Sequence, residues 1–457
     1  VGCAPLPAVA AGTGLSARTI TVTAAALRPP VVTPSLARLD VASATLVIRG
    51  ANFDPTAAGN VVTLSSGTVS SISSASATSL TVVFATQPSL GSLSASVTSF
   101  GLSSGAPVQV ANVAIPAWAV VGTAGFSAGS ANYVSLALDS TGTPFVAYQD
   151  GGNADKVTVQ KLVGGSWTVV GTAGFSAGAA YSMSLALDSI GTPFVAYQDG
   201  GNADKATVQT LVSGTWTVVG TAGFSAGQAF YTSLALDSTG IPFVAYQDGA
   251  NNFGATVQKL VAGSWTVVGT AGFSAGQAVF TSLALDATGT PFVAYQDGGN
   301  ADKATVQTLV SGSWTVVGTA GFSAGQAFYT SLALDSTGIP FVAYQDGANN
   351  FGATVQKLVA GSWTVVGTAG FSAGQAVFTS LALDSTGTPF VAYDDGNAGF
   401  AATVQKYESG SWTVVGTAGF SAGTAYFMSL ALDSTGKPFV AYKDSANNFG
   451  ATVQKYS

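Results

Sequence analysis

The residues of this chain that could do chemistry are acidic, and they recur in repeated motifs. The heptapeptide DGGNADK stands at Asp150, Asp199 and Asp297, and its oxygen-rich spacing could hold calcium. In other copies the same place reads DGANNFG, which has only one acid, so a plain turn between strands is the alternative. A second acid begins each LDSTG-type motif, where it is expected to accept backbone hydrogen bonds within a turn, or else to form one ligand site per copy. These acids are Asp139, Asp188, Asp237, Asp286, Asp335, Asp384 and Asp433.

Composition argues against catalysis. The chain has no histidine, which excludes a Ser-His-Asp triad, a Cys-His pair and a histidine-bound zinc. Glycoside hydrolysis needs two carboxylates at a set separation, whereas the acids here are nearly all equivalent copies and Glu408 is the only glutamate. A sialidase-like site is disfavoured because the repeats contain no arginine. An active site makes one place differ from its copies, so the sequence predicts a non-enzymatic protein without a cofactor.

The elements that must position these motifs form a long repeat. Residues 216–264 and 314–362 are identical, and all tryptophans recur every 49 residues. They are Trp118, Trp167, Trp216, Trp265, Trp314, Trp363 and Trp412.

Each period contains four β-rich runs. From Ser135 these are SLALD, PFVAYQD, VTVQKLV and WTVVG, separated by glycine-rich turns. A period of this length with four strands is typical of a β-propeller blade. The strand of Trp118 precedes any full set and the last repeat lacks its Trp strand, so we expect these two ends to complete one blade. The predicted fold is all-β, with a seven-bladed β-propeller over residues 115–457.

Two family resemblances rest on the repeats and on the motifs before them. The repeats, with LDSTGTPFVAY and GSWTVVG, resemble bacterial extracellular seven-bladed propellers. Residues 35–114 resemble the IPT/TIG family of immunoglobulin-like β-sandwiches, through LVIRGANFDP, NVVTLSSG, SLTVVF and GSLSASVTSFG. The resemblances imply a secreted or cell-surface protein whose sandwich acts as a spacer or an association module.

Residues 1–34 are expected to be an extended arm with a proline-rich stem. The run Arg18, Thr19, Ile20, Thr21, Val22 and Thr23 alternates polar and apolar side chains, and Pro29 and Pro30 stiffen the backbone after it. Such an arm is suited to adding a strand to a neighbouring molecule. The alternatives are the first strand of the sandwich or a loose tail. Cys3 is the only cysteine, and we expect either a plain thiol or a link between chains.

Charge and hydropathy limit the partners. The first 117 residues carry a net charge of +2 and the rest −9, which argues against nucleic acid. Ser, Thr and Gly interrupt every apolar run, so no transmembrane segment is predicted.

Two functions remain. The sequence favours a non-enzymatic extracellular structural protein, a subunit of a surface filament or layer that assembles with itself head to tail through the arm. The alternative is an adhesin that binds glycans at equivalent propeller sites. The repeated tryptophans, and the FSAG phenylalanines from Phe126 to Phe420, are expected to pack between blades, although they could instead stack on sugars.

Overall fold

The structure, a computed structural model, describes residues 27–457. The chain divides into two compact units, Val1–Ile115 and Pro116–Ser457. The predicted assembly strand Arg18–Thr23 and the thiol of Cys3 lie outside the described residues. Within residues 27–457, no helix is both long and apolar enough to cross a membrane.

The first unit consists of two β-sheets around one hydrophobic core. One sheet has the order β1 (Val31–Val32), β3 (Thr45–Ala51), β6 (Ser79–Thr86), β5 (Thr68–Ser76). The other has the order β2 (Arg38–Asp40), β9 (Val108–Ala114), β7 (Gly91–Ser99), β4 (Asn60–Leu64), with β8 (Leu102–Ser103) on β7 and the short 3-10 turn η1 (Ala57–Gly59) before β4.

Alternation along the strands builds the core of this unit. In β7 every second side chain is buried, among them Leu93 and Val97, because successive side chains point to opposite faces. Val31 and Val32 pair with Ala51 and Gly50. The end of the proline-rich stem is thus a sheet strand, and the expected boundary at residue 35 falls after it.

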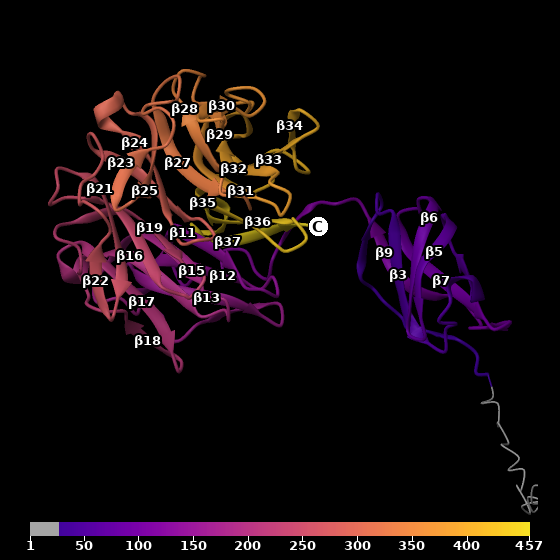
Figure 1. The fold of residues 1–457 in the computed structure, drawn as a ribbon. Coiled ribbons are helices and arrows are strands. Elements are labelled where there is room, and N and C mark those ends of the chain that lie inside the picture. Colours follow the sequence, from indigo (N-terminus) through magenta and orange to yellow (C-terminus); the bar gives the residue numbers. More distant parts are fainter. Residues whose placement is uncertain (1–26) are drawn as a thin grey trace, which may run out of the picture. The chain divides into compact units, whose positions relative to one another are not determined.

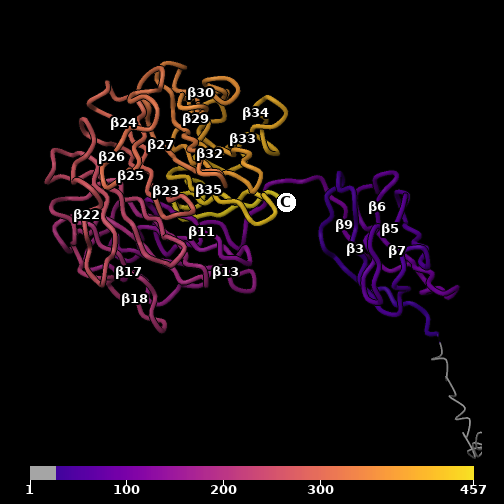
Figure 2. Tube along the Cα trace, in the orientation of Figure 1, coloured from indigo at the N-terminus to yellow at the C-terminus, as the bar shows by residue number. Residues whose placement is uncertain are grey.

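The second unit is a β-propeller-like repeat. Among the described residues it has seven four-stranded antiparallel sheets, and Figures 1 and 2 show them following one another around a centre. We number them in chain order, each from its inner strand outwards. Sheet 1 is β11 (Ala131–Leu138), β12 (Pro144–Asp150), β13 (Lys156–Val163), β14 (Ser166–Val169); sheet 2 is β15 (Ala180–Leu187), β16 (Pro193–Asp199), β17 (Lys205–Val212), β18 (Thr215–Val218); sheet 3 is β19 (Ala229–Leu236), β20 (Pro242–Asp248), β21 (Gly254–Val261), β22 (Ser264–Val267).

Sheets 4 to 7 repeat the pattern. Sheet 4 is β23 (Ala278–Leu285), β24 (Pro291–Asp297), β25 (Lys303–Val310), β26 (Ser313–Val316); sheet 5 is β27 (Ala327–Leu334), β28 (Pro340–Asp346), β29 (Gly352–Val359), β30 (Ser362–Val365). Sheet 6 is β31 (Ala376–Leu383), β32 (Pro389–Asp395), β33 (Ala401–Glu408), β34 (Ser411–Val414); sheet 7 is β35 (Ala425–Leu432), β36 (Pro438–Asp444), β37 (Gly450–Tyr456), β10 (Trp118–Val120). Short 3-10 turns come after the second strand in five sheets: η2 (Gly151–Asn153), η3 (Gly200–Asn202), η4 (Gly298–Asn300), η5 (Gly396–Ala398) and η6 (Ser445–Asn447).

The second strand of each sheet shows why the sheets pack against one another. Every residue of β12, PFVAYQD, is buried, because each face is covered by a neighbouring sheet. Phe145 and Ala147 pack toward sheet 2, while Val146 and Tyr148 pack toward sheet 7. Similar apolar clusters join every adjacent pair, including sheets 7 and 1, so the ring is closed by packing.

The strand that carries Trp118 lies in the last sheet. Residues Trp118, Ala119 and Val120 of β10 pair antiparallel with Tyr456, Lys455 and Gln454 of β37. Segments from opposite ends of the second unit therefore share one sheet.

Candidate functional site

The aspartates of the DGGNADK turns serve the turns themselves. The carboxylate of Asp150 is buried and accepts hydrogen bonds from the Gly152 N–H (3.0 Å), the Asn153 amide (2.8 Å) and the Thr158 hydroxyl (2.9 Å). Its oxygens are thereby occupied by donors. Across residues 27–457 no three acidic, histidine or cysteine side chains gather as metal ligands would. Calcium at these turns therefore remains a sequence-based hypothesis with no ligand cluster to support it.

The LDSTG aspartates also close turns. Oδ1 of Asp139 accepts from the N–H groups of Thr141 and Thr143, both at 2.9 Å, and from the Thr141 hydroxyl. Slight burial opposes the effect, but these hydrogen bonds hold the pKa of Asp139 below its usual value. The carboxylate of Asp139 therefore stabilises its own turn.

Each repeated tryptophan lies between two sheets. In all seven copies the indole stacks on the FSAG phenylalanine of the preceding repeat, with ring centroids 3.8–4.1 Å apart. The indole N–H donates to a valine carbonyl of that repeat at 2.7–2.8 Å, as Trp167 does to Val121. One ring face and the polar edge are thus used in packing, and these rings are poor candidates for sugar stacking.

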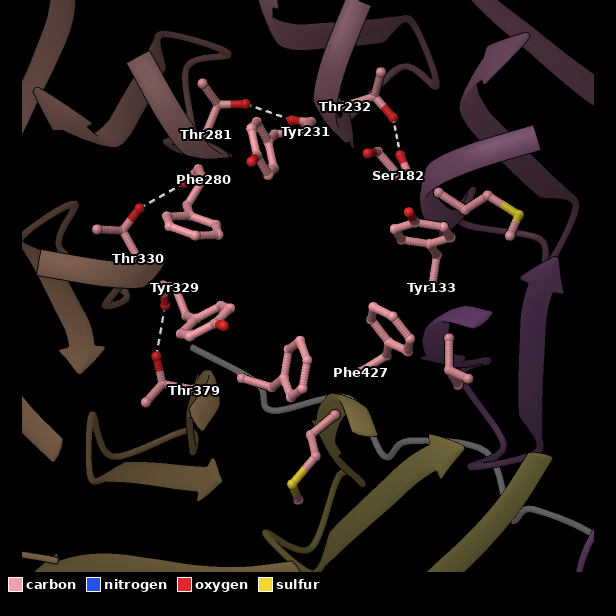
Figure 3. Close-up of a pocket in the computed structure, with 14 residues that line it drawn as sticks. Tyr133, Ser182, Tyr231, Thr232, Phe280, Thr281, Tyr329, Thr330, Thr379 and Phe427 are labelled. Atoms are coloured by element: carbon pink, nitrogen blue, oxygen red, sulfur yellow. Dashed lines mark hydrogen bonds between the residues drawn. The ribbon is translucent and has the colours of Figure 1, made fainter. Parts of the chain in front are cut away.

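A second set of aromatic residues surrounds the centre of the ring. Each inner strand has a bulge where one residue takes a positive φ near 50° and points toward the axis, and Figure 3 shows the resulting circle. The residues are Tyr133, Ser182, Tyr231, Phe280, Tyr329, Phe378 and Phe427. Neighbouring rings from Tyr231 through Phe427 to Tyr133 lie 4.7–5.0 Å apart, and Ser182 interrupts the circle.

The pocket at this centre has about 290 Å³ but few groups to recognise a polar ligand. Its four threonine hydroxyls already donate to backbone carbonyls of the preceding sheet, as Thr330 does to Phe280 and Thr379 to Tyr329, both at 2.5 Å (Figure 3). Among the described residues, no charged side chain lines it. The circle is best explained as a hub in which the bulge aromatics pack on one another.

A groove between sheets 5 and 6 combines aromatic rings with free amides. It has about 360 Å³ and is lined by Phe328, Tyr329, Gln345, Phe351, Gln375 and Val377. Phe328 and Phe351 lie 6.1 Å apart, tilted by 42°. Within the part of the chain that the structure describes, neither glutamine side chain has a hydrogen-bond partner, although Gln345 is only 7% exposed. Water-accessible amides beside exposed rings give a polar ligand both hydrogen-bonding groups and an apolar surface.

The same six side chains recur between sheets 3 and 4. They are Phe230, Tyr231, Gln247, Phe253, Gln277 and Val279, and most lie in the stretch that is identical in the two repeats. Phe230 and Phe253 are again 6.1 Å apart, tilted by 39°. We call these two places the twin grooves.

The alternate grooves are closed by an acid. Where the twin grooves have Phe253 and Phe351, the neighbouring sheets have Asp204 and Asp302. These carboxylates accept from the Gln228 and Gln326 amides at 3.1 Å. The glutamine equivalent to Gln375 is therefore occupied in the alternate grooves and free in the twin grooves.

At this place in the turn, a left-handed conformation occurs at a phenylalanine in four repeats, at Phe400 (φ +60°) and Phe449 (φ +58°) as well as at the two groove residues Phe253 and Phe351. Both have φ of +59°, in the left-handed region, and their side chains are 39% and 40% exposed. Asp tolerates this conformation better than a bulky side chain does, and an exposed Phe gains little by burial. The sequence thus places strained, partly exposed rings at the grooves, where each pairs with one other ring, Phe230 or Phe328.

The groove residues were not predicted from the sequence. In the sequence, the change from DGGNADK to DGANNFG was used only as an argument against calcium. The feature that could have indicated the grooves is the aromatic residue that replaces the second Asp of the motif. The arrangement across two sheets, which brings Gln375 opposite Phe351, required the structure.

Comparisons with known proteins give a fold-level likeness. No protein-family model matches the chain, and curated proteins give no significant match. Among solved structures, a protein of unknown function from Bacteroides thetaiotaomicron shares 13% identity over 94% of this chain and 98% of its own, with a TM-score of 0.43.

Two further structures match a smaller share of this chain. A polysaccharide lyase, an ulvan lyase, shares 12% identity over 73% of this chain and 94% of its own, with a TM-score of 0.47. The Aleuria aurantia lectin, solved with Fucα1-6GlcNAc, shares 18% over 66% of this chain and 100% of its own, with a TM-score of 0.43.

Proposed function

We propose that the second unit is a non-enzymatic glycan-binding module whose equivalent sites are the twin grooves. The observation that carries the proposal is the free glutamine amide beside two aromatic rings, present twice with the same six side chains. This is the alternative that the sequence left open, moved from the tryptophans to a different set of aromatic residues.

The chemistry of the groove suits a sugar. A pyranose presents C–H groups on one face, which pack on aromatic rings, and hydroxyls at its rim, which both donate and accept. Gln345 and Gln375 offer an amide oxygen and an NH₂ group each, so they can meet a hydroxyl in either role. Two weak sites on one chain would reinforce each other on a polyvalent surface.

A pair of substitutions that copies the chain's own alternate grooves tests the proposal. Phe253→Asp and Phe351→Asp should each introduce a carboxylate at the position equivalent to Asp204 and Asp302. This carboxylate should then accept a hydrogen bond from Gln277 or Gln375, respectively. The full chain is first screened on a glycan array, and the best neutral ligand is titrated by calorimetry. We expect each variant to remove one site and the double variant to remove binding.

Asp302→Asn is the matched control, because it changes the same turn in a groove without the aromatic pair. It should leave binding intact. The proposal is wrong if no glycan binds the full chain, or if the double variant binds as well as the parent.

We also propose a finer description of the fold. The seven sheets are the blades of a seven-bladed propeller of the extracellular kind, and the first unit is an IPT/TIG-like sandwich. In support, two sheets share one core in the first unit, and apolar clusters join each sheet of the second to its neighbours. A secreted or surface location is then expected.

Self-assembly is a second candidate, and one feature of the first unit favours it. Strands β4 and β5 stand at the open edges of their sheets, and a groove of about 420 Å³ between them is lined by Val61, Val62, Val69 and Ile72 with small neighbours. Val61 is 62% exposed. Neither strand has a charge or proline to protect its edge. Residues 18–23 of another copy, with Ile20 and Val22 on one face, would fill it.

Light scattering on the full chain and on a version without residues 1–26 tests this candidate. We expect a large species from the former and a monomer from the latter, and a synthetic peptide of residues 16–25 should dissociate the assembly. If both chains are monomers, or both assemble, the arm does not join molecules.

A further inference from the structure

A third aromatic pair lies between sheets 7 and 1, and it differs from the twin grooves in charge. Tyr426 and Phe449 have centroids 6.4 Å apart, tilted by 37°, close to the geometry of the other two pairs. Tyr426 is in register with Lys443, just as Phe328 is in register with Gln345. The position that supplies the nearly buried amide of a twin groove therefore supplies an ammonium group here.

No other sheet has a cation at this position. The six equivalents are Gln149, Gln198, Gln247, Gln296, Gln345 and Asp394. The residues on the facing sheet change as well. Ser130 and Asn132 take the positions that Gln375 and Val377 have in the groove between sheets 5 and 6. Among the seven described sheets of the second unit, this aromatic pair is thus the one with a cation beside it. We call the place formed by Tyr426, Lys443, Phe449 and Asn132 the groove between sheets 7 and 1.

Contacts hold Lys443 in the groove. Its ammonium donates to Asn132 Oδ1 at 2.7 Å and lies 5.1 Å from the ring centroid of Phe449 and 5.9 Å from that of Tyr426. The Asn132 amide in turn donates to Gln149 at 2.7 Å. No carboxylate of the described residues forms a salt bridge with Lys443. Because an ammonium has three hydrogens and one is used, two remain for a ligand.

We propose that the groove between sheets 7 and 1 binds an acidic sugar, with the ligand's carboxylate on Lys443 and its ring against Tyr426 and Phe449. This inference rests on the proposed function of the twin grooves and adds a specificity to it. A carboxylate would convert the remaining N–H groups into charge-assisted hydrogen bonds, which are stronger than neutral ones. Partial burial, which also lowers the pKa of Lys443, reduces the competition from water.

The acidic character of the second unit does not exclude an anion. Asp444, the residue that follows Lys443 in the sequence, is buried. Its carboxylate accepts hydrogen bonds from the Ala446 N–H, the Asn447 amide and the Thr452 hydroxyl. More distant surface charges are screened within about 8 Å at physiological ionic strength. The Asp444 oxygens are thus occupied within their own turn, whereas the Lys443 ammonium has N–H groups left to donate.

The test uses oligogalacturonate and its methyl ester, and glucuronate oligosaccharides with their neutral glucose counterparts, on the full chain. We expect at least one acidic member to bind about tenfold more tightly than its neutral partner, with the preference reduced at 0.5 M salt. Lys443→Gln copies the side chain of the twin grooves and should abolish the preference. Gln345→Lys, in the groove between sheets 5 and 6, should create a second preference.

The outcomes separate this inference from the proposed function. One contradicting result is that neutral glycans bind and the acidic members bind no more tightly; another is that Lys443→Gln retains the preference for acidic members. In either case Lys443 only links sheets 7 and 1, and the inference is overturned while the proposal for the twin grooves stands. If acidic sugars bind through Lys443 but the Phe253→Asp, Phe351→Asp double variant leaves neutral binding unchanged, the twin grooves fail instead.

Discussion

At the scale of single residues, substitution of a groove phenylalanine should affect glycan binding without lowering the stability of the fold. In Phe351→Asp a partial relief of left-handed strain, on the order of 1 kcal/mol because Asp tolerates this conformation better than Phe, offsets the loss of an aromatic pair worth about 0.5–1.5 kcal/mol. We expect the free energy of unfolding to be unchanged or higher while glycan binding falls, measured by denaturant titration beside calorimetry. A large loss of stability would mean that Phe351 is a packing residue and would remove the main argument for the groove.

A buried acid predicts a pH dependence at the same scale. Burial, opposed by the hydrogen bond from the Val377 N–H and reinforced by Asp395, raises the pKa of Asp394 to about 7. The folded state thus holds a proton that the unfolded state releases near pH 4, so this contribution to stability is present at low pH and is lost as the pH rises through 7. Asp394→Gln, the residue of five other sheets, should stabilise the protein by roughly 1–3 kcal/mol at pH 8 and hardly at pH 4. Equal effects at both pH values would contradict the assignment.

At the scale of elements, β10 pairs with β37 to complete sheet 7, and we call this pairing the seam. We expect the seam to be less stable than the pairing of the tryptophan strand in the other sheets. Trp314→Phe keeps the stack on Phe273 but removes the hydrogen bond to the Val268 carbonyl, which should cost about 1–2 kcal/mol. Trp118→Phe should cost more, because β10 is held by only three register pairs with β37. Denaturant titration and limited proteolysis near residue 118 compare the two variants, and equal losses would show that the seam is as firm as the other joints.

The elements were also what the sequence predicted well. Alternating β-rich runs and glycine-rich turns in SLALDSTGTPFVAYQD led to the four strands of each sheet, and the 49-residue spacing of the tryptophans led to their repetition. The grooves could not be predicted in this way, because Gln375 and Phe351 are in different repeats and meet only when sheets 5 and 6 pack. The bulges at Tyr133 and its equivalents were missed too, since no glycine announces their positive φ.

At the scale of the whole molecule, grooves of two kinds alternate from sheet 2 to sheet 6. The twin grooves have a free glutamine amide, and the alternate grooves have this amide bonded to Asp204 or Asp302. The six shared lining side chains favour similar affinities. One difference is that Asp394, in register with the groove residue Val377, stands where the groove between sheets 3 and 4 has Gln296 in register with Val279. If the arm also joins molecules, the number of sites on an assembly would multiply, and binding to a polyvalent surface would strengthen without any new contact.

Glycan binding by the twin grooves is tested most sharply by the number of neutral-glycan sites on the full chain, counted by calorimetry. We expect two sites in the parent chain, one in either Phe253→Asp or Phe351→Asp, and none in the double variant. A single site that survives both substitutions, or one site in every repeat, would contradict the assignment of binding to these two grooves.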